Sequence, residues 1–230
     1  MRYDCLLLDA DGTLLDCDSA EGLALQATFV QFEIPYSADY LEIYRGINTQ
    51  LWREIEQGTF SERALPVERF VRLSTALKLD LDAAPFGCAY LQQLAQRADT
   101  LPQADETLAA LHGRLRMVLV TNGLPMVQRS RLQRATITRY LDAIVISGEE
   151  GAAKPHPHVF DVALERAGNP PRERVLMVGD SLTADIAGGN NAGIDTCWIN
   201  PGGLPRDPRY TPTYEIRELA ELVALVLSES

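Results

Sequence analysis

The chain has 230 residues, a length that suits one domain of ordinary size or a core domain carrying a smaller inserted one. Apolar residues make up 46% of it, which is enough for a sizeable buried core and argues against disorder. The 32 acidic and 21 basic residues leave a formal charge of −11. A surface with that charge repels nucleic acids and anionic membranes, so we expect neither as a partner.

Short apolar segments alternate with helical patterns along much of the chain. The strand candidates, rich in Val, Ile and Leu and too short for core helices, are 3–8, 116–120, 143–146, 175–178 and 196–199. Helical patterns over 125–134, 157–167 and 183–191 lie between the later strands. Pro157 is typical of a helix start, and Gly168 and Gly193 stand where helix ends are expected. This alternation predicts an α/β fold, a doubly wound and mainly parallel sheet with helices on both faces.

The stretch after the first strand interrupts this alternation. Its helical patterns cover 21–32, 37–45, 49–57, 67–77 and 83–98, and it contains no convincing strand. We therefore predict a helical cap domain over residues 17–100, inserted into a core formed by 1–16 and 101–230. Residues 201–212 are rich in Gly and Pro and predict a loop, followed over 214–228 by a short strand or helix start and a closing helix.

Cysteine usage and the N-terminus indicate the compartment. The four cysteines, Cys5, Cys17, Cys88 and Cys197, are widely separated and lack the spacing of zinc ligands. The first apolar run is too short for a signal peptide, and no segment has the 18 apolar residues that span a bilayer. We expect a reduced, soluble, cytoplasmic protein, either a monomer or a homodimer.

Polar residues follow four of the predicted strands. Asp9-Ala10-Asp11-Gly12-Thr13-Leu14 comes after the first, Thr121-Asn122-Gly123 after the second and Gly179-Asp180-Ser181 after the fourth, while Lys154-Pro155 stands eight residues beyond the third. The carboxyl ends of parallel strands meet in one crevice, where ligands bind in open α/β sheets. We therefore expect these four segments to form one site, although each alone is most often an ordinary turn or a surface charge.

The residue types in this site predict its chemistry. Carboxylates without His or Cys favour a hard cation, best Mg²⁺, with Asp9, Asp180 and the Asp11 carbonyl as candidate ligands. Thr121 and the backbone N–H groups near Asn122 and Gly123 are suited to phosphate oxygens. Lys154 supplies positive charge to a phosphoryl group. Residues and spacing thus predict a crevice that binds a hard metal and an anion.

The four segments resemble the four motifs of the haloacid dehalogenase-like hydrolase superfamily. The resemblance extends over the whole chain, since Asp185, Gly188 and Ala192-Gly193 continue the fourth motif and the helical insertion lies between the first two. It implies a Rossmann-like hydrolase core with a cap, and a phosphatase that uses Mg²⁺. A dehalogenase, another member of the superfamily, would lack the acid at Asp11.

The resemblance also implies a role for each motif residue. Asp9 would be the nucleophile that forms an aspartyl-phosphate, and Asp11 the acid and then the base. Lys154 would pair with Asp9 and the phosphoryl oxygens, and Thr121, Asn122 and Gly123 would hold the phosphate. Asp9, Asp11, Asp180 and Asp185 would form the metal site, with Asp185 supporting the coordination shell from behind.

A narrower similarity is to the YjjG-type pyrimidine 5′-nucleotidases. The segments that carry it are 175–193, 196–200, 121–123, 142–147 followed by Lys154-Pro155, and 51–52 and 58 in the cap. It implies that the substrate is a pyrimidine nucleoside monophosphate. Gly12 departs from that group, which often has an acidic residue at this position. The alternatives are a phosphatase of a small acid or sugar phosphate, such as phosphoglycolate, and a catalytically silent binding protein.

Substrate choice is expected to depend on the cap. Trp52, Tyr44 and Phe60 are candidates for stacking on a base, and the alternative for each is a place in the core of the cap. Of the three, Trp52 is the residue we predict to bind substrate.

Overall fold

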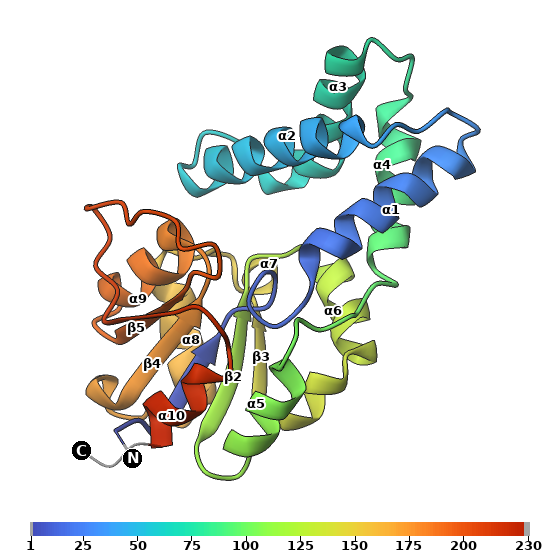
Figure 1. Ribbon diagram of the computed structural model, residues 1–230. Helices are drawn as coiled ribbons and strands as arrows, with labels where there is room; N and C mark the ends of the chain where they lie inside the picture. The colour runs from blue at the N-terminus through green and yellow to red at the C-terminus, as the bar shows by residue number, and fades with distance from the viewer. Residues whose placement is uncertain (1, 228–230) are drawn as a thin grey trace. The chain divides into compact units, whose positions relative to one another are not determined.

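The computed structural model describes residues 2–227, which divide into two compact units (Figure 1). Asp18–Arg97 form a helical unit, and the described residues on either side of that segment form an α/β unit. No helix within the described part of the chain is long and apolar enough to cross a membrane.

The α/β unit is built on a parallel sheet of six strands in the order β3-β2-β1-β4-β5-β6. The strands are β1 (Cys5–Leu8), β2 (Arg116–Thr121), β3 (Ala143–Ile146), β4 (Val175–Gly179), β5 (Asp195–Ile199) and β6 (Tyr214–Ile216). The central strand β1 is fully buried and pairs Leu7 with Val118 on one side and with Met177 on the other. The predicted doubly wound parallel sheet is confirmed, with β1 at its centre, where the order of the strands reverses.

Helices cover both faces of this sheet, as Figure 1 shows with α5 and α10 in front of the strands and α8 behind them. These and the shorter elements of the unit are α5 (Ala104–Leu111), α6 (Pro125–Arg134), η2 (Thr136–Tyr140), α7 (Ser147–Glu150), α8 (Pro157–Arg166), η3 (Arg172–Arg174), η4 (Leu182–Ile186), α9 (Ala187–Asn191) and α10 (Glu221–Leu227). Leu6 and Leu8 of β1 join the apolar core on one face, and Cys5 and Leu7 join the core on the other. Alternate side chains of one strand therefore anchor two helical layers.

The α/β unit departs from the prediction in its helices, and its closing segment agrees with the prediction. The helix predicted over 183–191 is a π-helical turn, η4, followed by the short helix α9. Helix α5 was not among the predicted helices. The closing segment contains both β6 and α10, and residue 228 of the predicted helix lies outside the described residues.

The helical unit consists of α1 (Cys17–Gln31), α2 (Asp39–Glu56), η1 (Glu62–Ala64), α3 (Leu65–Leu77) and α4 (Ala83–Leu94). The predicted separation of 37–45 from 49–57 is wrong, because α2 continues through Gly46, a residue that costs a helix only about 1 kcal/mol relative to Ala. The core of the unit is aromatic: the ring of Phe86 lies within 5.1 Å, centroid to centroid, of those of Phe29, Phe32 and Phe70.

Candidate active site

The first motif follows β1 directly. Asp9 is buried, and its backbone N–H donates to Val178 O at 2.9 Å, so the sheet itself fixes where this residue stands. Gly12 adopts a φ of +83°, a conformation that side chains other than glycine's rarely allow. A Cβ added there would lie 2.5 Å from Asp180 Oδ2. Glycine at this position thus lets the first and fourth motifs come into close approach.

Lys154 joins three of the motifs. Its Nζ donates to Asp9 Oδ1 at 2.6 Å, to Asp185 Oδ1 at 2.7 Å and to Val120 O at 2.7 Å. The Lys154 side chain is 2% exposed, so these hydrogen bonds are shielded from solvent, and charge-assisted hydrogen bonds are strong in such surroundings. All three donors of the ammonium are used, which fixes its position beside the Asp9 carboxylate.

Three carboxylates meet at this point. One oxygen from each of Asp9, Asp180 and Asp185 lies within 4.8 Å of the others. Trp198 Nε1 donates to the Asp180 backbone carbonyl at 2.8 Å, and the Ser181 backbone N–H donates to Asp185 Oδ2 at 3.0 Å. These bonds hold Asp180, just after β4, and Asp185, in η4. Three carboxylates against one ammonium leave two negative charges uncompensated, which is the charge that one divalent cation balances.

The acidity of these groups reflects that imbalance. Burial raises the pKa of Asp9 to about 7, with the Lys154 charge opposing and the Asp185 charge adding to the rise. The protein around the Asp180 carboxylate displaces water and, together with Asp9 and Asp185, raises the pKa of this group well above its ordinary value. Burial lowers the pKa of Lys154, but the negative charges of Asp185 and Asp9 outweigh this effect, so the pKa of Lys154 is raised. These ligand atoms are hard oxygens, and the carboxylates carry more negative charge than Lys154 balances. Such a set of oxygen ligands fits Mg²⁺.

The side chain of Asn122 in the second motif contacts the backbone of Lys154. Asn122 Nδ2 donates to Lys154 O at 2.9 Å, and Asn122 Oδ1 accepts from the Lys154 backbone N–H at 2.8 Å. Its side chain therefore holds the backbone of Lys154 on both sides. The Gly123 backbone N–H donates to Thr121 Oγ1 at 3.1 Å, while Thr121 itself is buried at the end of β2.

Asp11 makes contacts that sequence reasoning missed. Its Oδ2 accepts from Gln128 Nε2 at 2.5 Å, and its Oδ1 is paired with Arg131 Nη1. Both partners are buried residues of α6, one helical turn apart, whereas the Asp11 side chain is 28% exposed. A glutamine and an arginine at i and i+3 on the covered face of the helix after the second motif were the available signal.

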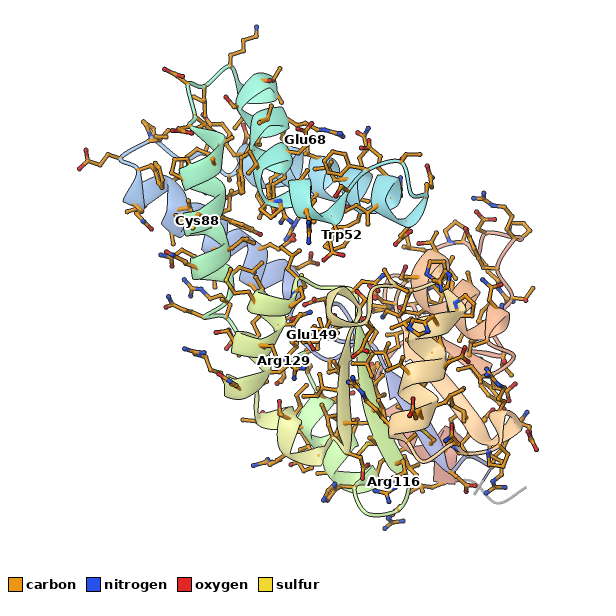
Figure 2. All side chains as sticks on the ribbon, turned by 180° about the vertical axis from the view of Figure 1, so that it is seen from behind. Trp52, Glu68, Cys88, Arg116, Arg129 and Glu149 are labelled. Atoms are coloured by element: carbon orange, nitrogen blue, oxygen red, sulfur yellow. The ribbon has the colours of Figure 1, made fainter. Side chains whose placement is uncertain are left out.

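The three cap aromatics occupy different environments within the helical unit. Tyr44 is fully buried, stacks on Phe70 and donates to Tyr90 Oη at 2.7 Å, so the core alternative is correct for this residue. Phe60 is half-buried beneath the Arg72 guanidinium. Trp52, labelled on α2 in Figure 2, is half-exposed, and no aromatic ring of the described residues packs against its indole. Trp52 is thus partly accessible to solvent.

Comparison with known proteins identifies the family. The model of the haloacid dehalogenase-like hydrolases matches residues 3–193, most of the chain. The chain belongs to the haloacid dehalogenase-like hydrolases. Within them it is 37% identical to the pyrimidine 5′-nucleotidase YjjG of Escherichia coli over 98% of this chain and 99% of that protein. It is 35% identical to the pyrimidine 5′-nucleotidase PynA of Streptococcus pneumoniae, over 97% of this chain and 94% of the relative.

Solved structures of haloacid dehalogenase-like hydrolases agree with this fold. The crystal structure of YfnB from Bacillus subtilis bound to magnesium has a TM-score of 0.94 and 36% identity, covering 99% of this chain and all of the other. A dehalogenase structure has a TM-score of 0.77 at 23% identity, covering 99% of this chain and 98% of the other, and it shares the fold alone. The resemblance of the sequence to this family of hydrolases is thus confirmed.

Proposed function

We propose that this protein is a Mg²⁺-dependent 5′-nucleotidase that hydrolyses pyrimidine nucleoside monophosphates through an aspartyl-phosphate on Asp9. The observation that carries the chemistry is the buried Asp9 carboxylate, paired with Lys154 beside Asp180 and Asp185. The full-length similarity to two pyrimidine 5′-nucleotidases supports the substrate class.

The residues divide the reaction into two displacements. In the first, an Asp9 oxygen forms a bond to phosphorus, the bond from phosphorus to the ester oxygen breaks, and Asp11 gives its proton to that leaving oxygen. In the second, Asp11 takes a proton from a water molecule whose oxygen attacks phosphorus. The bond to Asp9 then breaks, which releases inorganic phosphate and restores both carboxyl groups.

The remaining residues hold charges in place. Asp9, Asp180 and the Asp11 backbone carbonyl would bind Mg²⁺, with Asp185 behind them, and the bound ion would supply positive charge to the phosphoryl oxygens. Lys154 supplies a second positive charge from within the protein. Asn122 fixes the Lys154 backbone, and the Thr121 hydroxyl and nearby backbone N–H groups bind the phosphate.

The test is Mg²⁺-dependent phosphate release from dUMP, dTMP, UMP, dAMP, phosphoglycolate and a hexose phosphate, with Asp9→Asn as the control. We expect turnover of the pyrimidine monophosphates above the others and none by Asp9→Asn. Preference for phosphoglycolate or the hexose phosphate would keep the chemistry and overturn the substrate class. Equal turnover by Asp9→Asn would overturn the mechanism.

A further inference from the structure

Beneath the first two motifs lies a hydrogen-bonded network formed by Asp11, Gln128, Arg131 and Thr121. The Gln128 side-chain amide makes three hydrogen bonds within this network. Its Nε2 donates to Asp11 Oδ2 at 2.5 Å and to Thr121 Oγ1 at 2.8 Å. Its Oε1 accepts from Arg131 Nη1 at 3.4 Å. Arg131 Nη1 also pairs with Asp11 Oδ1. Both oxygens of the Asp11 carboxylate are therefore held by α6.

The network sets the direction of the Thr121 hydroxyl. Thr121 Oγ1 accepts from Gln128 Nε2 and from the Gly123 backbone N–H, and these two bonds occupy both acceptor positions of a hydroxyl oxygen. The hydroxyl hydrogen must then point to a third direction, as a donor. A donor is what a phosphoryl oxygen requires, so Gln128 presents Thr121 in the form that binds phosphate.

The local sequence makes room for this arrangement. A Cβ at Gly123 would lie 2.3 Å from Gln128 Nε2 and 2.7 Å from its Cδ. The glycine of the second motif thus leaves the space that the Gln128 side chain fills. An alanine at this position would displace the amide from Thr121 and Asp11.

Stabilisation of the fold does not explain this network. Gln128 and Arg131 are each 1% exposed, and a buried ion pair is commonly matched or exceeded in stability by apolar side chains of the same volume. The one member of the network that reaches solvent is Asp11, the group that exchanges protons in the proposed reaction. The burial of polar groups is concentrated behind a reacting carboxylate.

We infer that Gln128 and Arg131 are positioning residues, which hold the Asp11 carboxylate for proton transfer and orient the Thr121 hydroxyl toward the phosphoryl group. This inference rests on the proposed function, and it adds two residues of α6 to the machinery of that site. Proton transfer by a placed carboxylate depends on its distance from the leaving oxygen, so the loss of either residue acts on turnover more than on binding.

The test uses substrates with different leaving groups. Nitrophenolate leaves p-nitrophenyl phosphate as an anion, so formation of the aspartyl-phosphate on that substrate needs no proton from Asp11. A nucleoside or other alkyl leaving group does need it. The variants are Arg131→Met and Gln128→Met, with Arg131→Lys as the conservative replacement that keeps the charge.

Arg129→Met is a matched control. Arg129 lies on the same helix, but it is exposed and pairs with Glu149 at 2.5 Å; both are labelled in Figure 2. It undergoes the same change of residue without touching the network.

We expect Arg131→Met and Gln128→Met to lower kcat on the best alkyl phosphate by about 100-fold, with KM changed less than about 3-fold. On p-nitrophenyl phosphate, the first turnover of Arg131→Met should stay within about 3-fold of the wild type. Gln128→Met, which also releases the Thr121 hydroxyl, should lose some rate on this substrate but less than on the alkyl phosphate. Slow steady-state release should follow in both variants because Asp11 also activates the water. Arg131→Lys should fall between Arg131→Met and the wild type.

Equal losses on both substrates in the first turnover, or rates matching Arg129→Met, would overturn the inference. Thermal melting of each variant measures the folded fraction, and rates are expressed per folded enzyme. If Arg131→Met does not fold, Gln128→Met and Gly123→Ala provide the test. For each, the first-turnover rate is divided by that of the wild type, once on the alkyl phosphate and once on p-nitrophenyl phosphate, and the two ratios are compared. Activity in Asp9→Asn would instead refute the proposed function, so the two failures are distinguishable.

Discussion

Removing the Lys154 charge tests the electrostatic balance of the site. The chain has two lysines: Lys154, 2% exposed, and Lys78, exposed at the end of α3. In Lys154→Met, a side chain of similar length loses its three hydrogen bonds, and Asp9, Asp180 and Asp185 are left without a protein cation. Removing one partner of a buried ion pair costs about 3–5 kcal/mol, so we expect the free energy of unfolding to fall by that amount in EDTA.

The sign of the pH dependence follows from the same groups. The pKa of Asp9 is raised to about 7 in the folded protein from an ordinary value of 3.8, so the folded state binds more protons than the unfolded state between these values. Stability contributed by this site therefore falls as pH rises through that range. Without Lys154 the pKa rises further, and the destabilisation of Lys154→Met should be larger at pH 8 than at pH 6.

The assay is urea unfolding followed by tryptophan fluorescence. The chain contains two tryptophans, Trp52 in the helical unit and Trp198 buried in β5. In a Trp52→Phe background the signal comes from Trp198 and reports on the α/β unit that holds the site. Lys78→Met, in the same background, is the matched control and should change stability by less than about 0.5 kcal/mol.

A double-mutant cycle gives the result that refutes this reasoning. Asp185→Asn removes one of the carboxylates that Lys154 neutralises, so Lys154→Met/Asp185→Asn should lose at least about 1 kcal/mol less than the sum of the single variants. Additivity within about 0.5 kcal/mol, or a Lys154→Met loss no larger than that of Lys78→Met, would show that the ammonium does not balance these carboxylates.

Three further results are expected. EDTA should abolish turnover, and added Mg²⁺ should restore it. Asp180→Asn should need at least about 10-fold more Mg²⁺ for half-maximal rate, because a carboxylate ligand is lost. An unchanged Mg²⁺ requirement would exclude Asp180 from the metal site. Trp52→Ala should raise KM for a nucleoside monophosphate by about 5- to 150-fold, equivalent to 1–3 kcal/mol of base stacking, and leave KM for phosphoglycolate unchanged; equal effects on both substrates would refute stacking. Asn122→Ala should lower kcat by at least about 10-fold through a displaced Lys154 backbone, measured beside the exposed Asn169→Ala, and activity matching that control would contradict the positioning of Lys154.

Five strands of the sheet were predictable from the sequence because each is a short apolar run followed by polar residues. The sixth, β6, has three residues with Glu215 at its centre and lacks that signal. A short run of apolar residues needs little from its neighbours to be recognised as a strand. The edge strand 143–146 shows this, because it has the same bounds in the prediction and in the structure. Helix boundaries depended on more. The prediction left residues 46–48 between two helices. In the structure the buried side chains of Tyr44 and Leu51 on either side of Gly46 keep α2 continuous, since packing outweighs the small propensity cost of one glycine.

The candidate site was predictable in its charged residues and not in its hydrogen bonds. Asp9 and Asp180 follow strands directly, so their approach is a consequence of parallel pairing between β1 and β4. The partners of Asp11 come from the interior of α6, where position along the helix decides whether a polar side chain faces the sheet. For the same reason the use of the Asn122 side chain to hold Lys154 could not be read from a motif.

The Asp9 and Asp11 carboxylates, two residues apart, are paired with different cations, which explains how they can act differently. Asp9 lies with Lys154 in a group that carries excess negative charge, which a bound divalent cation would balance. Asp11 is paired with Arg131 on the α6 side and remains partly exposed. In the proposed mechanism, the Asp9 carboxylate is thereby kept beside Lys154 as the nucleophile, while the Asp11 carboxylate is held by α6 and stays open to water. An acid and base must exchange protons repeatedly, and a carboxylate consumed as a metal ligand could not do so.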